Sequence, residues 1–421
     1  NLDAAISTAA AELKLKKKRV DRIYAQIKKQ AKFQPVLISE NSNWAELAAL
    51  QAKNIPGLHV RNAFTRVYEM GPAGAQIFGY VGAPSEPVPN APFMTTGVTG
   101  LEKRFNDELA GIPGQTVMIT NAVGRVTGED KSQFRPAVAG ADLRTTINDV
   151  AQRAMYDALM QHRAGCGVAL DIDTGDILAM VSTPSFDANM FSADDGEEYI
   201  ASLRNDTMKP FMNKAVEGLY PPGSTFKIVV ALAALEAGAI TANEKVFCPG
   251  HWDYGDRRYH CWEAKGHGWV TLADALKHSC DIYFYQLALK IGIDSIKEMA
   301  IKLGFTQKYM DDVLSREMAG IIPDRYWKEE AIGYRWMHGD TIISGIGQGF
   351  TLTNCLQLAV MTARTVSNRV VMPRLILTDE KPQFAHLGLQ QKNINAVMRG
   401  LEQVTRRGGT AAGSAINVNG A

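Results

Sequence analysis

Long apolar runs, cysteine and an excess of either charge are all scarce in this sequence. No stretch of about 18 or more apolar residues is present, so the printed chain predicts no membrane-spanning helix. Five cysteines in 421 residues are too few for a disulfide scaffold, and the odd number leaves at least one unpaired within the chain. The 45 Lys and Arg residues balance 44 Asp and Glu, so the composition gives no reason to expect nucleic acid as a partner.

The chain is longer than one hydrophobic core usually organises, so we expect at least two domains. Residues 1–145 read as helices and then short strands, and they contain no chemical constellation. Residues 146–421 open with a helix pattern at 148–162 and a hairpin pattern at 167–182, which begins a sheet. Further helices are predicted at 225–238, 271–278, 282–291 and 355–366. The pattern predicts an α+β protein.

One local excess of positive charge lies at Lys14, Lys16, Lys17, Lys18 and Arg19, within a segment of helical spacing. Such a run is usually a solvated helix face, and this is the interpretation we favour. Contact with an anionic lipid surface is the alternative.

The segment from Tyr220 to Lys227, YPPGSTFK, predicts an activated serine. Pro-Pro-Gly cannot continue a helix, whereas the apolar run after Lys227 is typical of a buried one, so Ser224 is expected at a helix start. Lys227 follows three residues later and so lies on the same helix face as Ser224, close enough to share a proton. A desolvated lysine can serve as the base that a serine nucleophile needs, and the helix N-terminus favours a developing oxyanion.

The alternative is that Ser224 only caps the helix and Lys227 is solvated, because the S-x-x-K pattern is common by chance. The context favours chemistry, since the lysine heads a helix too apolar for the surface and an obligate turn delivers the serine.

Ser279-Cys280-Asp281 forms a second candidate motif between two predicted helices. In an extended or turn tripeptide the first and third side chains project together, so Ser279 and Asp281 can face one cleft while Cys280 points away. The pair can then relay a proton and hold Lys227. Taken alone, the same residues are equally typical of an ordinary helix cap.

Gly345-Ile346-Gly347-Gln348-Gly349 is a third feature, and it is typical of a loop that allows close approach. It lacks the spacing of a dinucleotide-binding loop, so nucleotide binding is the weaker alternative.

In this order the motifs closely resemble the class B penicillin-binding proteins, and among them the penicillin-binding protein 2 group of elongation transpeptidases. Ser224-Thr225-Phe226-Lys227 matches the S-x-x-K motif. Ser279-Cys280-Asp281 stands where the family has S-x-N. With Asp281 in place of Asn, the motif resembles that of the elongation enzymes rather than that of the division enzyme. Gly347-Gln348-Gly349 resembles the family's substrate-binding region. The signature-like stretches are Gly97–Lys103, Gly124 with Arg125, and Asp171–Asp187.

The resemblance implies a non-catalytic pedestal of the dimerisation type at 1–145. It also implies a transpeptidase domain at 146–421, with an antiparallel sheet between helical layers. The implied reaction is a D,D-transpeptidation that cross-links peptidoglycan stem peptides through an acyl-serine, with β-lactams as inhibitors. Ser224, Lys227, Ser279 and Asp281 would be catalytic. The alternatives are a septal transpeptidase, a β-lactamase or penicillin sensor, and a scaffold without activity.

The family's third motif, Lys-Ser/Thr-Gly, does not occur before the chain stops at Gly420-Ala421. We expect that strand to follow in the full protein, and a membrane anchor to precede Asn1. The resemblance then implies the periplasmic side of the inner membrane, with a polytopic glycosyltransferase and scaffold proteins as partners.

In the periplasm Cys248 and Cys261 can form a disulfide. A competing arrangement adds His267 and Cys280 to them as a Cys3His set, whose four soft ligands within 33 residues suit structural zinc. Free thiols are the third alternative, and catalysis needs no cofactor in any of them. Cys166 and Cys355 lie in apolar patterns, and we predict that they are buried core residues.

Overall fold

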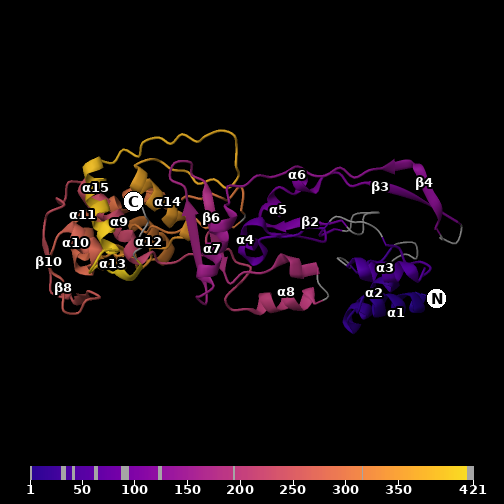
Figure 1. The fold of residues 1–421 in the computed structure, drawn as a ribbon. Coiled ribbons are helices and arrows are strands. Elements are labelled where there is room, and N and C mark those ends of the chain that lie inside the picture. The colour runs from indigo at the N-terminus through magenta and orange to yellow at the C-terminus, as the bar shows by residue number, and fades with distance from the viewer. Residues whose placement is uncertain are drawn as a thin grey trace. The chain divides into compact units, whose positions relative to one another are not determined.

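The computed structural model describes residues 2–29, 35–39, 43–60, 65–86, 94–121, 126–192, 195–314 and 316–414. Gly124, Arg125 and the final Gly420-Ala421 lie outside the described residues. The chain divides into two compact units (Figure 1). Unit 1 comprises Asn1–Leu143 and Pro184–Phe211, and unit 2 comprises Arg144–Thr183 and Met212–Ala421. Residues 184–211 therefore pack with unit 1, although they follow the predicted domain boundary near residue 145 in sequence.

Both units mix helices with short sheets, which confirms the predicted α+β class. Among the described residues the strands form two-stranded sheets, and every pair is antiparallel. No helix in the described ranges is both long and apolar enough to cross a bilayer.

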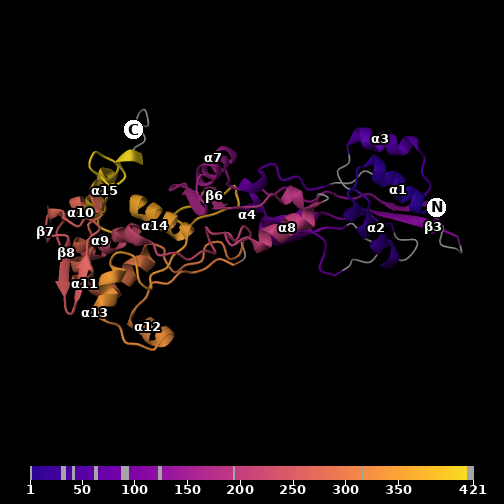
Figure 2. The ribbon, with the colours of Figure 1, turned by 90° about the horizontal axis from the view of Figure 1, so that it is seen from below.

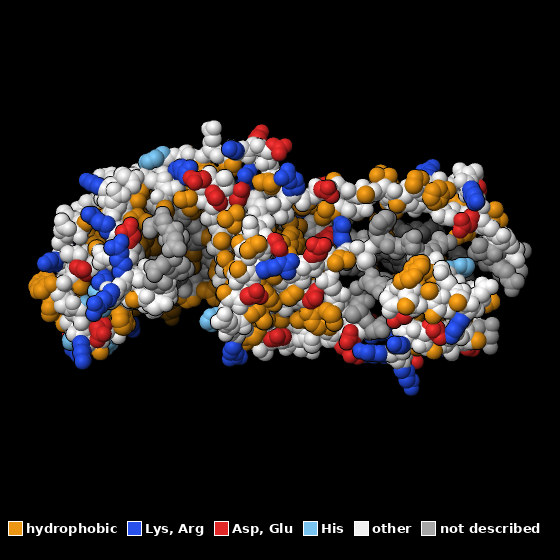
Figure 3. All heavy atoms as spheres, viewed as in Figure 1, with side chains coloured by type: hydrophobic (Ala, Val, Ile, Leu, Met, Phe, Trp, Pro, Cys, Tyr) orange, Lys and Arg blue, Asp and Glu red, His pale blue; other side chains and the backbone are white. Residues whose placement is uncertain are grey.

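Unit 1 opens with the helices α1 (Leu2–Glu12), α2 (Lys17–Lys29) and α3 (Trp44–Ala52). Ile6, Ile23 and Leu50 are buried, one from each helix. Two lysines of the lysine-rich stretch, and Arg22 after it, pair with acids at the start of α8 (Gly196–Asn205). These exposed ion pairs are Lys16–Asp195 at 3.4 Å, Lys18–Glu198 at 2.6 Å and Arg22–Glu197 at 3.1 Å. On the face drawn in Figure 3, acidic and basic side chains are interspersed.

An aromatic cluster joins residues 184–211 to the rest of unit 1. Phe186 is buried against Ala75, and its ring lies 5.8 Å from Tyr80 and 5.1 Å from Phe211, centroid to centroid. The remaining elements of unit 1 are η1 (Gly71–Ala73), α4 (Ala75–Phe78), β1 (Tyr80–Gly82), β2 (Thr96–Thr99), α5 (Gly100–Arg104), α6 (Asn106–Ala110), β3 (Gln115–Thr120), β4 (Val126–Arg135) and η2 (Ala188–Ser192).

Unit 2 begins with α7 (Asp149–Leu159) and the hairpin of β5 (Gly165–Leu170) and β6 (Ile177–Thr183), as predicted. The turn forms because Asp171 Oδ1 accepts the N–H groups of Asp173 and Thr174, at 2.8 and 2.9 Å. Helix α7 packs against β6, and α14 (Cys355–Ser367) packs against β5.

A disulfide between Cys166 and Cys355 joins β5 to the first residue of α14, with the two Cα atoms 6.6 Å apart. The prediction that both are buried core residues is therefore wrong, and each is only half-buried. The apolar neighbours of these cysteines reflect the packing of α14 on β5, which brings together two thiols 189 residues apart in sequence.

The core of unit 2 is built around α9 (Lys227–Glu236), in which every residue but the last is buried. Helix α9 packs against α11 (Asp281–Lys302) and α15 (Gln391–Val404), and it lies between them in Figure 2. Helix α11 breaks at Gly292, near the end of the helix predicted at 282–291. The remaining elements are η3 (Gly223–Phe226), β7 (Val246–Cys248), β8 (His251–Tyr254), β9 (Arg257–His260), β10 (Gly268–Val270), α10 (Leu272–Lys277), α12 (Arg325–Ile332), α13 (His338–Ser344) and η4 (Ala412–Ser414).

Candidate active site

Ser224 lies in the single turn of 3-10 helix that leads into α9. The chain approaching this turn is fixed because Tyr220 N donates to Thr353 O at 2.8 Å and Thr353 N donates back at 2.9 Å. At the turn itself Gly223 N donates to Gly347 O at 2.9 Å. The prediction that an obligate turn delivers the serine to a helix start is confirmed.

Lys227 is the first residue of α9, and its side chain is 1% exposed. Its Nζ donates to Ser279 O at 2.9 Å, to Ser279 Oγ at 3.0 Å and to Asp281 Oδ1 at 2.7 Å. A lysine ammonium has three donors, so these acceptors satisfy all of them. Nζ also lies 5.5 Å from the centre of the Phe284 ring, which adds a cation–π contact. Lys227 is therefore buried, and it is held by the second motif rather than solvated.

Ser279 links the lysine to the candidate nucleophile, because its Oγ donates to Ser224 Oγ at 2.8 Å. Within the described residues no hydrogen bond joins Lys227 Nζ directly to Ser224 Oγ. The expected direct contact between Ser224 and Lys227 is thus replaced by a path through Ser279. A 3-10 turn aligns residues i and i+3, so Ser224 and Lys227 keep a common face, and Ser279 Oγ hydrogen bonds to both of them.

The tripeptide Ser279-Cys280-Asp281 has the predicted alternation. Ser279 and Asp281 line the cleft, whereas Cys280 is fully buried. Ser279 has a φ of 51°, in the left-handed region that non-glycine residues rarely adopt. Asp281 opens α11, where a carboxylate is favoured by the helix dipole, and its Oδ2 accepts the N–H of Trp262 at 3.0 Å.

These side chains face an open cleft of about 730 Å³. Several residues that line this cleft were not predicted from the sequence, since nothing in their residue types marks them as cleft residues. Burial raises the pKa of the Tyr285 hydroxyl in this wall, which keeps the phenol neutral. The cleft is lined by Ser224, His260, Cys261, Trp262, Ser279, Asp281, Tyr285, Ile346, Gln348 and Thr410.

The loop Gly347-Gln348-Gly349 makes the close approach that its composition predicts, because Gly347 lies against the turn that carries Ser224. Gly347 has a φ of 68°, and a Cβ there would lie 2.3 Å from Gly223 O. A side chain at this position would therefore displace the turn that carries Ser224. Gln348 is exposed and lines the cleft. Gly349 has a φ of 74° but does not line the cleft.

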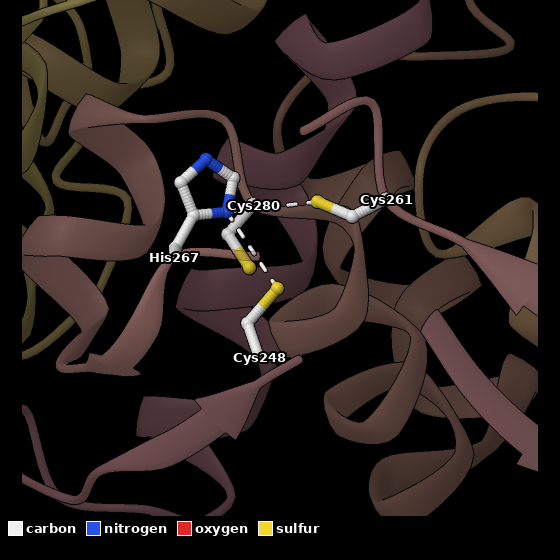
Figure 4. A group of neighbouring side chains, drawn as sticks. All are labelled: Cys248, Cys261, His267 and Cys280. Atoms are coloured by element: carbon white, nitrogen blue, oxygen red, sulfur yellow. Dashed lines mark hydrogen bonds between the residues drawn. The ribbon is translucent and has the colours of Figure 1, made fainter. Parts of the chain in front are cut away.

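The four predicted metal ligands converge behind the tripeptide (Figure 4). Cys248 ends β7, Cys261 follows β9, His267 precedes β10 and Cys280 precedes α11. Their candidate ligand atoms all lie within 4.8 Å of one another. The Sγ atoms of Cys248 and Cys261 are each 3.6 Å from His267 Nδ1. Cys248, Cys261 and Cys280 are free thiols, so the alternative of a Cys248–Cys261 disulfide is not what the structure contains.

This donor set fits tetrahedral zinc. Zn–S and Zn–N bonds of usual length at a tetrahedral angle place sulfur and nitrogen about 3.6 Å apart, which is the separation seen here. A hydrogen bond with the Cys280 thiol lowers the pKa of Cys261 to about 5, and that same bond together with burial raises the pKa of Cys280. One thiolate is thus already favoured in the cluster, as a metal ligand requires.

Two family models match the chain. The model for the penicillin binding protein transpeptidase domain covers residues 165–420, and the model for the penicillin-binding protein dimerisation domain covers residues 2–145. The chain belongs to the penicillin-binding protein transpeptidase family. The resemblance drawn from the motifs is therefore confirmed.

Curated relatives carry the name peptidoglycan D,D-transpeptidase MrdA. The protein of Haemophilus influenzae is 33% identical over 392 residues, which are 89% of this chain and 60% of that protein. The protein of Escherichia coli K12 is 33% identical over 363 residues, 82% of this chain and 57% of that protein. The chain therefore spans about six tenths of the length of these family members.

Solved structures of the family have the same fold. PBP2 of Pseudomonas aeruginosa, in complex with WCK 5153, matches with a TM-score of 0.71 and 34% identity, covering 84% of this chain and 78% of that one. PBP2 of Helicobacter pylori in a complex with MreC matches with a TM-score of 0.77 and 25% identity, covering 96% of this chain and 80% of that one.

Proposed function

We propose that this chain is part of a peptidoglycan D,D-transpeptidase that works through an acyl-serine on Ser224. The observation that carries the proposal is the hydrogen-bonded path from Ser224 through Ser279 to the buried Lys227, which opens on a cleft. Structural serines at helix starts do not need such a path. Family membership and the names of the relatives support the same reaction.

In the proposed acylation, Ser224 Oγ attacks the penultimate D-alanyl carbonyl of a stem peptide. The step requires Lys227 as the neutral amine, which reverses the two hydrogen bonds of the resting state, so that Ser224 Oγ–H donates to Ser279 Oγ and Ser279 Oγ–H donates to Lys227 Nζ. As Oγ attacks, the Ser224 proton moves to Ser279 Oγ and the Ser279 proton moves to Nζ, which becomes an ammonium. The backbone N–H of Ser224 favours the oxyanion, whereas that of Gly223 is already bonded to Gly347 O. The tetrahedral intermediate then collapses, the C–N bond breaks, and D-Ala leaves with a proton returned through the same side chains.

In the proposed deacylation, an amine of a neighbouring stem attacks the ester carbonyl and Ser224 Oγ leaves and regains a proton. The product is a 4→3 cross-link. Asp281 orients Lys227 throughout, since its Oδ1 accepts from Nζ while its Oδ2 is held by Trp262. Gly347 permits the turn geometry, Gln348 contacts substrate from the cleft wall, and Gly349, with a φ of 74°, lets the loop bend after them.

Fluorescent penicillin tests this reaction on the full-length protein, because a β-lactam mimics the donor and acylates the same serine. We expect wild-type protein to be labelled and Ser224→Ala to be unlabelled. Unlabelled wild type, or labelled Ser224→Ala, would overturn the proposal. Nitrocefin separates a transpeptidase, which forms a stable acyl-enzyme, from a β-lactamase, which turns the substrate over continuously.

We further propose a role in cell elongation rather than division. Asp281 in the second motif and the MrdA and PBP2 relatives support this role. Depletion in the native organism decides between the two, since loss of the elongation enzyme gives round cells and loss of the division enzyme gives filaments.

We propose that residues 1–145 act as a dimerisation-type pedestal that binds a scaffold protein and a polytopic glycosyltransferase at the periplasmic face of the inner membrane. One related structure is a PBP2 complex with MreC, and another is described as structural coordination of polymerization and crosslinking by a peptidoglycan synthase complex. Co-purification of the full-length protein with its native partners tests this, and loss of binding on deleting residues 1–145 is the expected result.

We propose that Cys248, Cys261, His267 and Cys280 bind structural zinc, which would tie the loop after β9 to the start of α11. No catalytic step requires the ion. Elemental analysis of purified protein tests the site, with about one zinc per chain expected and no metal near that level contradicting it.

A further inference from the structure

Trp262 lies between the Cys/His cluster and the catalytic side chains, and it hydrogen bonds to the second motif through both its backbone and its side chain. It directly follows Cys261, and its backbone N–H donates to Asp281 Oδ2 at 3.0 Å. Its indole Nε1 donates to His278 O at 2.9 Å and to Ser279 O at 3.1 Å. One residue thus contacts the segment 278–281 at three acceptors.

The two indole contacts fix the conformation of Ser279. The carbonyl of His278 belongs to the peptide before Ser279, and the carbonyl of Ser279 belongs to the peptide after it. Holding both peptide planes from one N–H group therefore constrains φ and ψ of the residue between them. Ser279 needs such a constraint, because its φ of 51° is unfavourable for a non-glycine residue and persists only where its surroundings impose it.

The conformation of Ser279 decides whether the proton path exists. Its Oγ must lie 2.8 Å from Ser224 Oγ and 3.0 Å from Lys227 Nζ at the same time. Its carbonyl oxygen must also accept from Nζ, at 2.9 Å. A rotation of Ser279 towards ordinary backbone angles would break these contacts together.

Core packing does not explain why a tryptophan stands at position 262, because the residue is 59% exposed. A tryptophan this exposed adds little to a core, yet its N–H group is directed at backbone carbonyls rather than at solvent. We propose that Trp262 is a positioning residue for acylation, which holds Ser279 in its left-handed conformation through its indole N–H. This inference rests on the proposed acyl-serine function.

The test is Trp262→Phe in the full-length protein, which removes the N–H and keeps an aromatic ring. The readout is penicillin acylation followed over a range of concentrations, which separates the limiting acylation rate from the half-saturating concentration. We expect the limiting rate to fall about fivefold, as the loss of one hydrogen bond of about 1 kcal/mol predicts, with the half-saturating concentration unchanged. The melting temperature should change little.

Trp269→Phe is the matched control. Trp269 is 66% exposed in the same unit, and its ring lies 5.3 Å from that of Phe247, centroid to centroid, but it does not line the cleft. We expect it to acylate at the wild-type rate.

A second variant removes only the donor, in case Trp262→Phe does not fold. A full-length chain with 3-benzothienylalanine at position 262 has sulfur in place of the N–H and nearly the same shape, so it should show the same fall in rate. Wild-type rates in both variants, or a change only in the half-saturating concentration, would overturn the inference, as would an equal loss in Trp269→Phe. If the wild-type protein is not acylated, the proposed function fails instead.

Discussion

The two sides of the tripeptide Ser279-Cys280-Asp281 differ in burial and in the partners of their side chains. On the cleft side, Ser279 and Asp281 are hydrogen bonded to the buried Lys227 and open to solvent. On the core side, Cys280 is fully buried among the other candidate metal ligands. A reactive site must keep its donors and acceptors accessible, whereas a structural site must exclude water. Backbone alternation lets three adjacent residues meet both demands.

The cleft side should dominate catalysis. Lys227→Met removes the amine but keeps the volume of the side chain, so Ser279 loses the group that takes its proton. We expect the acylation rate to fall by about 10²–10⁴-fold in a fluorescent penicillin assay, the range for loss of a general base.

Asp281→Asn is the matched control for Lys227→Met, since an amide oxygen can still accept from Lys227 or Trp262. We expect a loss of no more than about tenfold. Wild-type acylation by Lys227→Met would show that the path from Ser224 to Lys227 is not used.

The core side should dominate stability. Cys280→Ser removes one of the four proposed zinc ligands within the core, so the fold should lose the free energy of metal binding. We expect the melting temperature of the zinc-loaded protein to fall by about 10 °C, and a chelator to lower that of wild type similarly but not that of the variant. Equal responses of the two proteins to the chelator would contradict the metal assignment.

The Cys166–Cys355 disulfide is a covalent link that belongs to neither side of the tripeptide and does not line the cleft. Replacing both cysteines by serine should lower the free energy of unfolding by about 2–4 kcal/mol, because the cross-link restricts a long segment of the unfolded chain. Denaturant unfolding measures this loss. The acylation rate should stay at the wild-type value, and a large fall in rate would place the link within the catalytic machinery.

Glu317 is a buried carboxyl group that does not line the cleft, so it shows the effect of burial alone on a titratable side chain. Its Oε2 accepts the N–H of Tyr309 at 2.6 Å, while the buried Oε1 has no hydrogen-bond partner among the described residues. Burial raises the pKa of this carboxyl, so the folded state holds its proton more tightly than the unfolded state. Its contribution to stability is therefore present at low pH and is lost as pH rises through the folded pKa.

Glu317→Gln should remove this dependence, because an amide has no proton to lose in this range. We expect the melting temperature of the variant to fall less than that of wild type as the pH rises from 5 to 8. The lower limit lies roughly one unit above the usual pKa of a carboxyl group. Parallel curves for the two proteins would mean that the carboxyl does not titrate there.

Sequence reasoning predicted the site where a local rule applies. Pro221 and Pro222 require a turn before the apolar α9, and alternation separates Cys280 from its neighbours. The contacts it missed depend on tertiary packing. Cys166 meets Cys355 only because α14 packs on β5. The relay through Ser279, in contrast, was predicted from the alternation of its tripeptide. Trp262 acts through N–H groups, and no residue pattern indicates where those point.

The central claim is that Ser224 is the nucleophile, and locating the covalent adduct tests it most directly. After reaction of the full-length protein with penicillin, mass spectrometry of the digested protein should find the added mass of the drug on Ser224 alone. The Ser224→Ala variant should carry no adduct. An adduct on another residue, or one that persists in Ser224→Ala, would contradict the account.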